Sequence, residues 1–193
     1  MTTWHWVRHG PTHAKSFVGW RDVPADLSDT AQIERLRNHL PQNALVVSSD
    51  LDRARRTADA IQSAAHHRLP HDPHLREMHF GHWDGKHFGH VSETHPELSR
   101  AFWEQPGDVT APGGESWNVT SARVHAAVQN ITHQYSDEHI IAVAHFGVIL
   151  TQLQRALGVT AYEALAYKID NFSVTQIDRT AENTSVSLIN HVP

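Results

Sequence analysis

The chain alternates between short apolar runs and longer segments in which apolar residues recur every three or four positions. The apolar runs at residues 4–7, 44–47 and 139–144 have the length and composition of strands buried in a sheet. Strands that alternate with helices form a mostly parallel sheet. The pattern therefore predicts an α/β fold, a three-layer sandwich with a mostly parallel central sheet flanked by helices.

Helical spacing predicts four helices between and after these strands. Ser28 is the expected N-cap of the first helix and Pro41 ends it, while Gly158 is the expected C-cap of the last. The other three helices are expected at residues 51–65, 119–135 and 146–157.

The remaining segments have weaker patterns. Residues 66–95 are rich in His, Pro and Gly and predict a long loop with one short strand near residues 69–72. No repeat or linker divides the chain, so residues 1–193 are expected to form one domain. Three more strand-like pieces close the chain, at residues 166–169, 173–177 and 186–189.

Composition narrows the classes of function. A formal net charge of −5 gives no general attraction for nucleic acid, so an anionic ligand must be held by a local cluster of cations. The chain has no cysteine, which excludes disulfides and thiolate metal sites. No apolar run approaches the length of about 18 residues that spans a bilayer, and the first residues do not resemble a secretory signal. A cytoplasmic protein without a membrane partner is expected.

Basic side chains follow three of the predicted elements at the same edge of the sheet. The first strand ends in Arg8, His9 and Gly10, Arg53 lies in the first turn of the helix after the second strand, and His145 follows the third. Ligands of parallel sheets bind at the carboxyl ends of the strands, so these side chains are expected to converge. A cation at a helix N-terminus is unfavourable because it opposes the helix dipole. A bound anion near Arg53 would explain why this position carries a cation.

This set of groups suits phosphoryl transfer. Arg8 and Arg53 can neutralise a phosphoryl dianion, while His145 donates to a third oxygen. His9 would then attack phosphorus in line with the leaving oxygen. Since these groups supply the positive charge, neither a metal nor another cofactor is expected, and the partner is a small phosphorylated substrate.

The leaving oxygen also needs a proton. Glu77 is the candidate donor, because Met78, Phe80 and a nearby phosphate would all disfavour its charged form. By its spacing alone, Glu77 is better explained as a solvated acid in a loop.

Five motifs in order together resemble the histidine phosphatase superfamily, also called the phosphoglycerate mutase-like family. They cover nearly the whole chain and comprise Val7-Arg8-His9-Gly10, Ser49-Asp50-Leu51-Asp52-Arg53-Ala54, Leu75-Arg76-Glu77-Met78-His79-Phe80-Gly81, Gly114-Glu115-Ser116 and Ala144-His145-Phe146-Gly147. The resemblance implies that His9 is the phosphorylated nucleophile and Glu77 the acid. It also implies a substrate-binding set of Arg8, Gly10, Thr12, Trp20, Arg53 and His145.

The chain departs from the mutases of this family at several positions. Lys15 stands where the mutases carry Asn, and Phe146 where many members carry Gly. The mutases also hold the substrate carboxylate with a basic cluster between the acid and the later helix, where this chain offers only Arg100 besides histidines from residue 88 to 115. A phosphatase is therefore favoured over a cofactor-dependent mutase, and the run from Glu77 to Trp83 looks most like the alpha-ribazole phosphatase branch.

Other interpretations stay open at this point. Histidines crowd residues 66–95 and raise the alternative of a metal-binding module, although no pair has the spacing of a zinc-binding helix. A sensor of phosphorylated ligands on the same fold is a further alternative, and a homodimer is left open. Four aromatic residues either shape a lid over the substrate or pack in the core, with the core expected first: Trp83, Phe88, Trp103 and Trp117.

Overall fold

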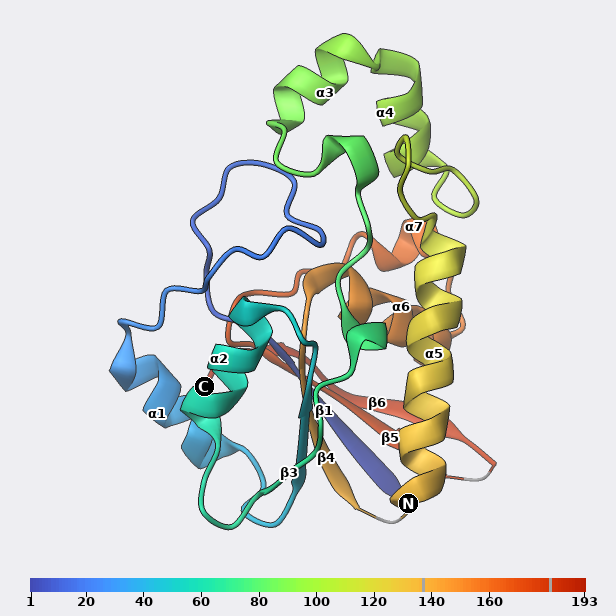
Figure 1. Cartoon of the computed structure of the whole chain (residues 1–193). Helices are drawn as coiled ribbons and strands as arrows, with labels where there is room; N and C mark the ends of the chain where they lie inside the picture. The colour runs from blue at the N-terminus through green and yellow to red at the C-terminus, as the bar shows by residue number, and fades with distance from the viewer. Residues whose placement is uncertain (137, 181) are drawn as a thin grey trace.

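A six-stranded sheet forms the centre of the computed structural model, which describes residues 1–136, 138–180 and 182–193 (Figure 1). The strands lie in the order β3-β2-β4-β1-β5-β6. Their bounds are Thr2–Arg8 for β1, Leu45–Ser48 for β2, His67–Arg68 for β3, His139–Ala144 for β4, Val174–Arg179 for β5 and Thr184–His191 for β6.

Most of the sheet is parallel, as the alternation of strands and helices predicts. β1 pairs in parallel with β4, β4 with β2, and β2 with β3. β5 runs antiparallel to β1, and β6 antiparallel to β5. The strands from β1 to β4 therefore present their carboxyl ends at one edge of the sheet.

Helices cover both faces of the sheet and confirm the three-layer sandwich. α1 and α2 pack on one face, and α5 and α6 on the other (Figure 1). The helices span Thr30–His39 (α1), Asp52–Ile61 (α2), Phe88–Thr94 (α3), Pro96–Glu104 (α4), Trp117–Gln134 (α5), Phe146–Leu157 (α6) and Ala161–Ala164 (α7), with short 3-10 helices at Pro73–Leu75 and Gly81–Trp83.

The alternation of side chains along β1 and β4 creates two separate cores. Trp4 and Trp6 stack on each other in the core beneath α5 and α6, whereas Val7 faces the core beneath α1 and α2. β4 alternates in the same way, with Ile140 in the first core and Ile141 in the second. Because β4 is covered on both faces, it is apolar at every position after His139.

The segment at residues 66–95, predicted as a long loop, contains more structure than its pattern indicates. β3 comes two residues before the strand expected near residues 69–72, and α3 and α4 form a cap beyond the carboxyl edge of the sheet (Figure 1). α3 buries only Val91, so it has no apolar stripe that sequence periodicity could detect.

Three expected element bounds are also wrong. α2 ends at Ile61 rather than residue 65, because residues 62–65 are not buried against the sheet. Asp29, not Ser28, is the N-cap of α1, and its carboxylate accepts a 3.0 Å hydrogen bond from the Gln32 N–H. Residues 166–169 form no strand, since the carbonyl of Ile169 accepts from the Arg8 guanidinium instead of a neighbouring strand.

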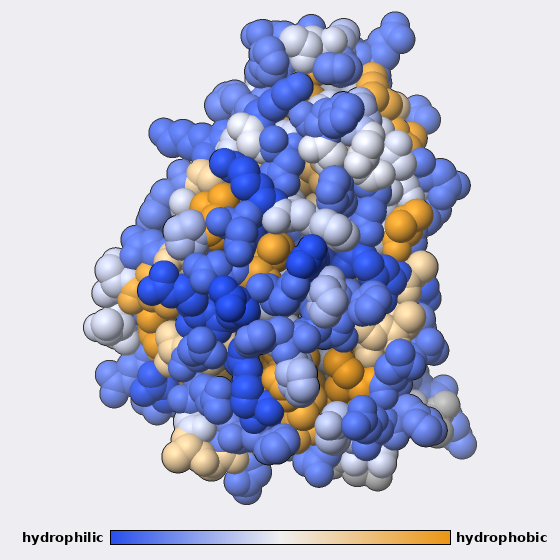
Figure 2. Space-filling model, viewed as in Figure 1, coloured by the Kyte–Doolittle hydropathy of each residue, from blue (hydrophilic) through white to orange (hydrophobic). Residues whose placement is uncertain are grey.

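Hydrophilic residues cover most of the face shown in Figure 2, and apolar ones form small separate groups on it. Among the described residues, no helix is both long and apolar enough to cross a membrane.

Replacing Asp29 with Ala should lower the free energy of unfolding by about 1 kcal/mol, because α1 loses its side-chain cap. Urea denaturation followed by circular dichroism measures this loss, and Ser28→Ala is the matched control because Ser28 precedes the cap. An equal loss for both variants would show that the Asp29 cap is not the feature that stabilises this end of α1.

Candidate active site

An open cavity lies at the carboxyl edge of the sheet, between the end of β1, the start of α2 and the cap formed by α3 and α4. Its volume is about 260 Å³. Its walls are formed by Arg8, His9, Thr12, Ala14, Ser16, Phe17, Val18, Arg53, Glu77, Phe80, Phe88, Trp103 and Phe146.

The pairing of β1 with β4 brings two of the predicted site residues together. Arg8 lies opposite Ala144, so His9 and His145 leave neighbouring strands at the same level. The His9 N–H donates to the Ala144 carbonyl at 3.1 Å, and the two imidazole rings lie 5.1 Å apart between centroids. His145 is completely buried behind the wall of the cavity.

His9 is held in the orientation that a nucleophile requires. Its Nδ1 lies 2.7 Å from the Gly10 carbonyl oxygen, which fixes the proton on Nδ1 and leaves the lone pair on Nε2. The Asn171 side chain also donates to the His9 carbonyl at 2.7 Å. Burial, together with the Arg53 and Arg8 guanidinium groups, lowers the pKa of His9 well below its usual value, so the ring is neutral at neutral pH.

Arg53 is anchored by backbone carbonyls and not by a carboxylate. It is almost fully buried, and its guanidinium donates to Gly19 at 2.7 Å and to Arg21 at 3.1 Å. Arg8 is anchored in the same manner by Ile169 and lies over the ring of Phe146, 5.4 Å from its centroid. Both cations therefore keep their positive charge for a ligand.

Several buried polar atoms around the cavity have no hydrogen-bond partner within the described part of the chain. They are Nε of Arg8, Nε of Arg53, and both Nδ1 and Nε2 of His145. Burial and Arg53 also lower the pKa of His145 well below its usual value, so its ring is neutral and carries one N–H to donate. Buried polar groups normally have partners, and a cluster of unpaired donors and cations is a site for an anion.

Glu77 lies in the same cavity with its carboxylate almost fully buried. The carboxylate accepts hydrogen bonds from the N–H groups of Met78 at 2.9 Å and Gly147 at 3.1 Å. Burial raises the pKa of Glu77, and this effect outweighs the opposing hydrogen bonds and cations. The solvated loop acid is thus not what the structure contains, and the side chain suits a proton donor.

Gly147 is a site residue that the sequence reasoning did not identify. A Cβ atom at this position would lie 2.6 Å from Oε1 of Glu77. Only glycine allows the carboxylate to approach the N-terminus of α6 this closely.

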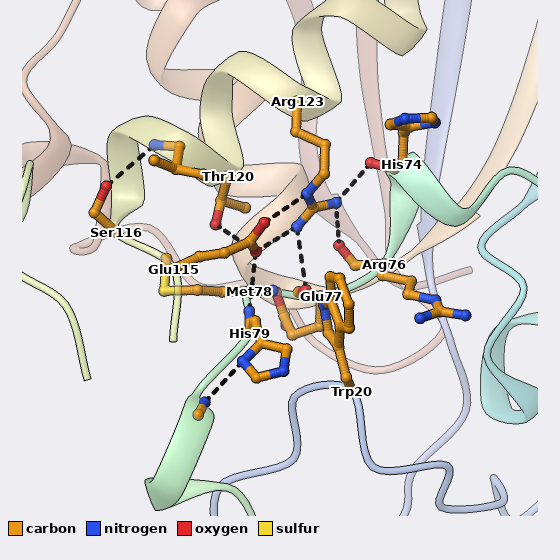
Figure 3. Close-up of polar contacts among 12 residues, drawn as sticks. Trp20, His74, Arg76, Glu77, Met78, His79, Glu115, Ser116, Thr120 and Arg123 are labelled. Atoms are coloured by element: carbon orange, nitrogen blue, oxygen red, sulfur yellow. Dashed lines mark hydrogen bonds and ion pairs between the residues drawn. The ribbon is translucent and has the colours of Figure 1, made fainter. Parts of the chain in front are cut away.

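Arg123 on α5 is a second site residue that the sequence motifs did not indicate. It holds the loop that carries Glu77 in place (Figure 3). Its guanidinium donates to the carbonyls of His74 at 2.7 Å, Arg76 at 3.0 Å and Glu77 at 3.3 Å. It also forms a two-pronged ion pair with Glu115, at 2.9 and 2.7 Å. One side chain thereby satisfies three carbonyls of an irregular segment that has no strand partner for them.

Glu115 extends this network to the other side of the loop (Figure 3). Its carboxylate also accepts from the His79 N–H at 3.0 Å and the Thr120 hydroxyl at 3.2 Å. Burial acts to raise the pKa of Glu115, but the Arg123 guanidinium and the hydrogen bonds hold it below its usual value. Glu115 therefore stays ionised and keeps Arg123 in place.

The other three predicted binding residues, Thr12, Trp20 and Gly10, lie in three different surroundings. Thr12 lines the cavity. Trp20 lies behind the loop instead, where its Nε1 donates to the Glu77 carbonyl at 2.7 Å. The N–H of Gly10 donates to the Thr57 hydroxyl at 3.0 Å, and a Cβ there would lie 2.7 Å from Phe172. Gly10 thus serves close packing rather than direct approach to an anion.

The histidines of residues 66–95 do not converge. Among the described residues, no group of three His, Asp, Glu or Cys side chains is placed to hold a metal ion. Instead, many of these rings have separate local partners. The partners are the Pro41 carbonyl for His66, the Ser48 hydroxyl for His71, Asp72 for His74, the Gly81 N–H for His79 and the Gly89 N–H for His87.

Residues 5–192 match the sequence model of the histidine phosphatase superfamily (branch 1). The chain belongs to this superfamily, as its motifs predict, and is an enzyme of its phosphatase class.

Comparison with individual proteins agrees with this assignment. Phosphoglycerate mutase-like protein 4 of Arabidopsis thaliana is 34% identical over 158 residues, which cover 78% of this chain and 69% of the relative. The structure of YhfR from Bacillus stearothermophilus is similar with a TM-score of 0.91 and 25% identity, covering 100% of this chain and 98% of the other. The alpha-ribazole phosphatase of Shigella flexneri shares the fold with a TM-score of 0.83 at 24% identity, over 98% of this chain and 96% of that one.

Replacing Arg123 with Gln should lower the free energy of unfolding by about 2–3 kcal/mol, because Glu115 loses its cationic partner and the carbonyls of His74 and Arg76 lose the donor that Arg123 provides. The loss from Glu115→Gln should then be much smaller in the Arg123→Gln background than in the wild type, since the pair is already broken. Urea denaturation of the four proteins measures both effects, with the exposed Arg100→Gln as control. Additive losses would contradict a coupled network.

Proposed function

We propose that this protein is a metal-independent phosphomonoesterase that hydrolyses a small phosphorylated metabolite through a phosphohistidine on His9. The observation that carries the proposal is the neutral, oriented His9 ring in a wall shared with the guanidinium groups of Arg8 and Arg53. In this scheme residues 1–193 act as one catalytic domain.

The first step transfers the phosphoryl group to the enzyme. The lone pair on Nε2 of His9 attacks phosphorus as the bond to the leaving oxygen breaks, while Arg8, Arg53 and the His145 N–H stabilise the charge on the other phosphoryl oxygens. In the second step water attacks the phosphohistidine and the bond between phosphorus and Nε2 breaks. The ionised Glu77 takes the proton of the water, and inorganic phosphate is released. These groups supply the charge stabilisation for which other phosphoryl-transfer enzymes use magnesium.

Glu77 is the proton donor to the leaving oxygen in this scheme. With ordinary pKa values of about 4.3 for Glu and about 6.5 for His, few molecules would hold a protonated Glu and a neutral His at the same time. The structure moves both pKa values in the useful direction, since burial raises that of Glu77 and lowers that of His9. Their opposite shifts favour the one combination of protonation states that can react.

Hydrolysis is better supported than a mutase reaction, although several sequence relatives are named as phosphoglycerate mutase-like or as probable phosphoglycerate mutases. A mutase must hold a second anionic group of its substrate. Arg100 lies on α4 outside the walls of the catalytic cavity, and Lys15 is exposed and outside them as well. The cavity walls near the cap are instead aromatic, with Phe88 and Trp103 among them.

His9→Ala should abolish turnover of p-nitrophenyl phosphate while the far-ultraviolet circular dichroism stays unchanged, because the substitution removes the nucleophile from the end of a strand. Rapid acid-labile phosphate trapping should label the wild type and not this variant. His90→Ala, an exposed histidine outside the cavity, is the control and should behave as the wild type.

Appreciable turnover by the His9→Ala protein would overturn the covalent mechanism. The assays are repeated after dialysis against EDTA, where activity should persist. Loss of activity that added zinc or magnesium restores would contradict the metal-independent reaction.

Glu77→Gln should reduce kcat/KM by about 10²–10⁴-fold on an alkyl phosphate, but far less on p-nitrophenyl phosphate, whose phenolate departs with little help from an acid. The wild-type pH profile should be bell-shaped. Its acidic limb reports protonation of His9 and its basic limb ionisation of Glu77, so the basic limb should be absent from the variant.

An equal loss on both substrates with the basic limb retained would contradict this role. Glu77 would then only hold the loop against Gly147, and another group would be the acid.

A further inference from the structure

A second cavity adjoins the catalytic one, under the cap formed by α3 and α4. Its volume is about 40 Å³, against about 260 Å³ for the catalytic cavity. Its walls are formed by Glu77, Met78, Phe80, Phe102, Trp103, Pro106, Val109, Trp117, Phe146, Gly147 and Leu165. We name this cavity the apolar subsite.

The apolar subsite adjoins the catalytic cavity, and the two share part of their walls. Glu77, Phe80, Trp103 and Phe146 line both. Arg8, His9 and Arg53 line only the catalytic cavity. Glu77 therefore borders both the cavity that holds these cations and the apolar subsite.

The walls of the apolar subsite are almost entirely hydrocarbon. Glu77 is the one ionisable side chain among the residues that form them. Trp117 directs its polar atom elsewhere, since its Nε1 donates to the Gln154 side chain at 2.7 Å. Phe102 and Trp103 meet edge to face, with ring centroids 5.0 Å apart, and add flat apolar surface. Such walls favour an uncharged apolar group and offer nothing to a second anion.

We propose that the apolar subsite binds the leaving group of the substrate, which makes the preferred substrate a phosphomonoester of an apolar alcohol or phenol. This inference rests on the proposed function and specifies its substrate class. As Nε2 of His9 bonds to phosphorus, the ester oxygen leaves and takes the proton of Glu77. The apolar body of the alcohol lies in the apolar subsite during this transfer, and the neutral alcohol leaves before water attacks the phosphohistidine.

A series of unbranched alkyl phosphates from propyl to octyl tests this proposal. The leaving alkoxides have nearly the same basicity, so differences in rate report binding of the chain and not chemistry. If the chain enters the apolar subsite, kcat/KM should rise by about two- to fourfold for each added methylene until the subsite is filled. Glycerol phosphate, with hydroxyl groups on the chain, should be a poorer substrate than propyl phosphate.

Val109→Asp places a carboxylate in the wall of the apolar subsite but outside the catalytic cavity. It should lower kcat/KM for octyl phosphate at least tenfold and lower that for propyl phosphate by a smaller factor, because the shorter chain buries less apolar surface in the subsite. Val119→Asp makes the same change at an exposed position of α5 outside both cavities, and should alter neither rate. Val109→Ser makes a milder change in the same wall. The comparison of chain lengths in the wild type tests the proposal without any variant.

The outcomes separate this inference from the proposed function. Normal turnover with no dependence on chain length would overturn the apolar subsite and leave the phosphomonoesterase standing. If no ester is turned over, the proposed function fails, and calorimetric titration with alkyl phosphonates still tests the subsite. Affinity that rises with chain length and falls in the Val109→Asp protein would then support it, and affinity independent of length would overturn it.

Discussion

The pairing of β1 with β4 is the constraint on which the site depends. Because Arg8 lies opposite Ala144, the next residue of each strand is a histidine, and the two rings meet at the edge of the sheet. A shift of one residue in this register would turn Trp4 and Trp6 away from their core and separate the histidines at the same time. The energy that fixes the register comes from the two apolar cores, so the positions of the catalytic candidates follow from packing.

Buried charged and polar side chains, whose desolvation disfavours folding, lie together at the same edge of the sheet. Nε of Arg8, Nε of Arg53 and both ring nitrogens of His145 lie buried with no partner among the described residues. Desolvation of such groups is unfavourable unless a ligand satisfies them. The surrounding backbone compensates in part, since carbonyls of Gly19, Arg21 and Ile169 hold the guanidinium groups. The site is thus arranged for an anion and not for the stability of the chain.

Glu77 illustrates how an irregular segment can be as well defined as a strand. Its loop has few backbone partners of its own, and the carbonyls are satisfied by Arg123 and by Trp20 (Figure 3). Glu115 in turn holds Arg123. The position of the carboxyl group between the catalytic cavity and the apolar subsite therefore depends on an ion pair formed by α5, far from Glu77 in the sequence.

The sequence by itself determined the elements that are strongly apolar or strongly periodic. β4, α6 and the C-cap at Gly158 agree with the predicted bounds, because a fully apolar strand and an amphipathic helix are encoded locally. The convergence of His9, Arg53 and Glu77 on one cavity was also predicted, since parallel strands end at one edge and the family motifs mark the positions.

Only the tertiary structure decided the features that depend on contacts distant in sequence. α3 has too few buried positions to show a period, and residues 166–169 lack a strand partner because Arg8 takes the Ile169 carbonyl. The need for glycine at position 147 appears only when Glu77 lies against it. The apolar subsite likewise exists only because the cap brings Trp103 and Val109 over Glu77, which no local pattern encodes.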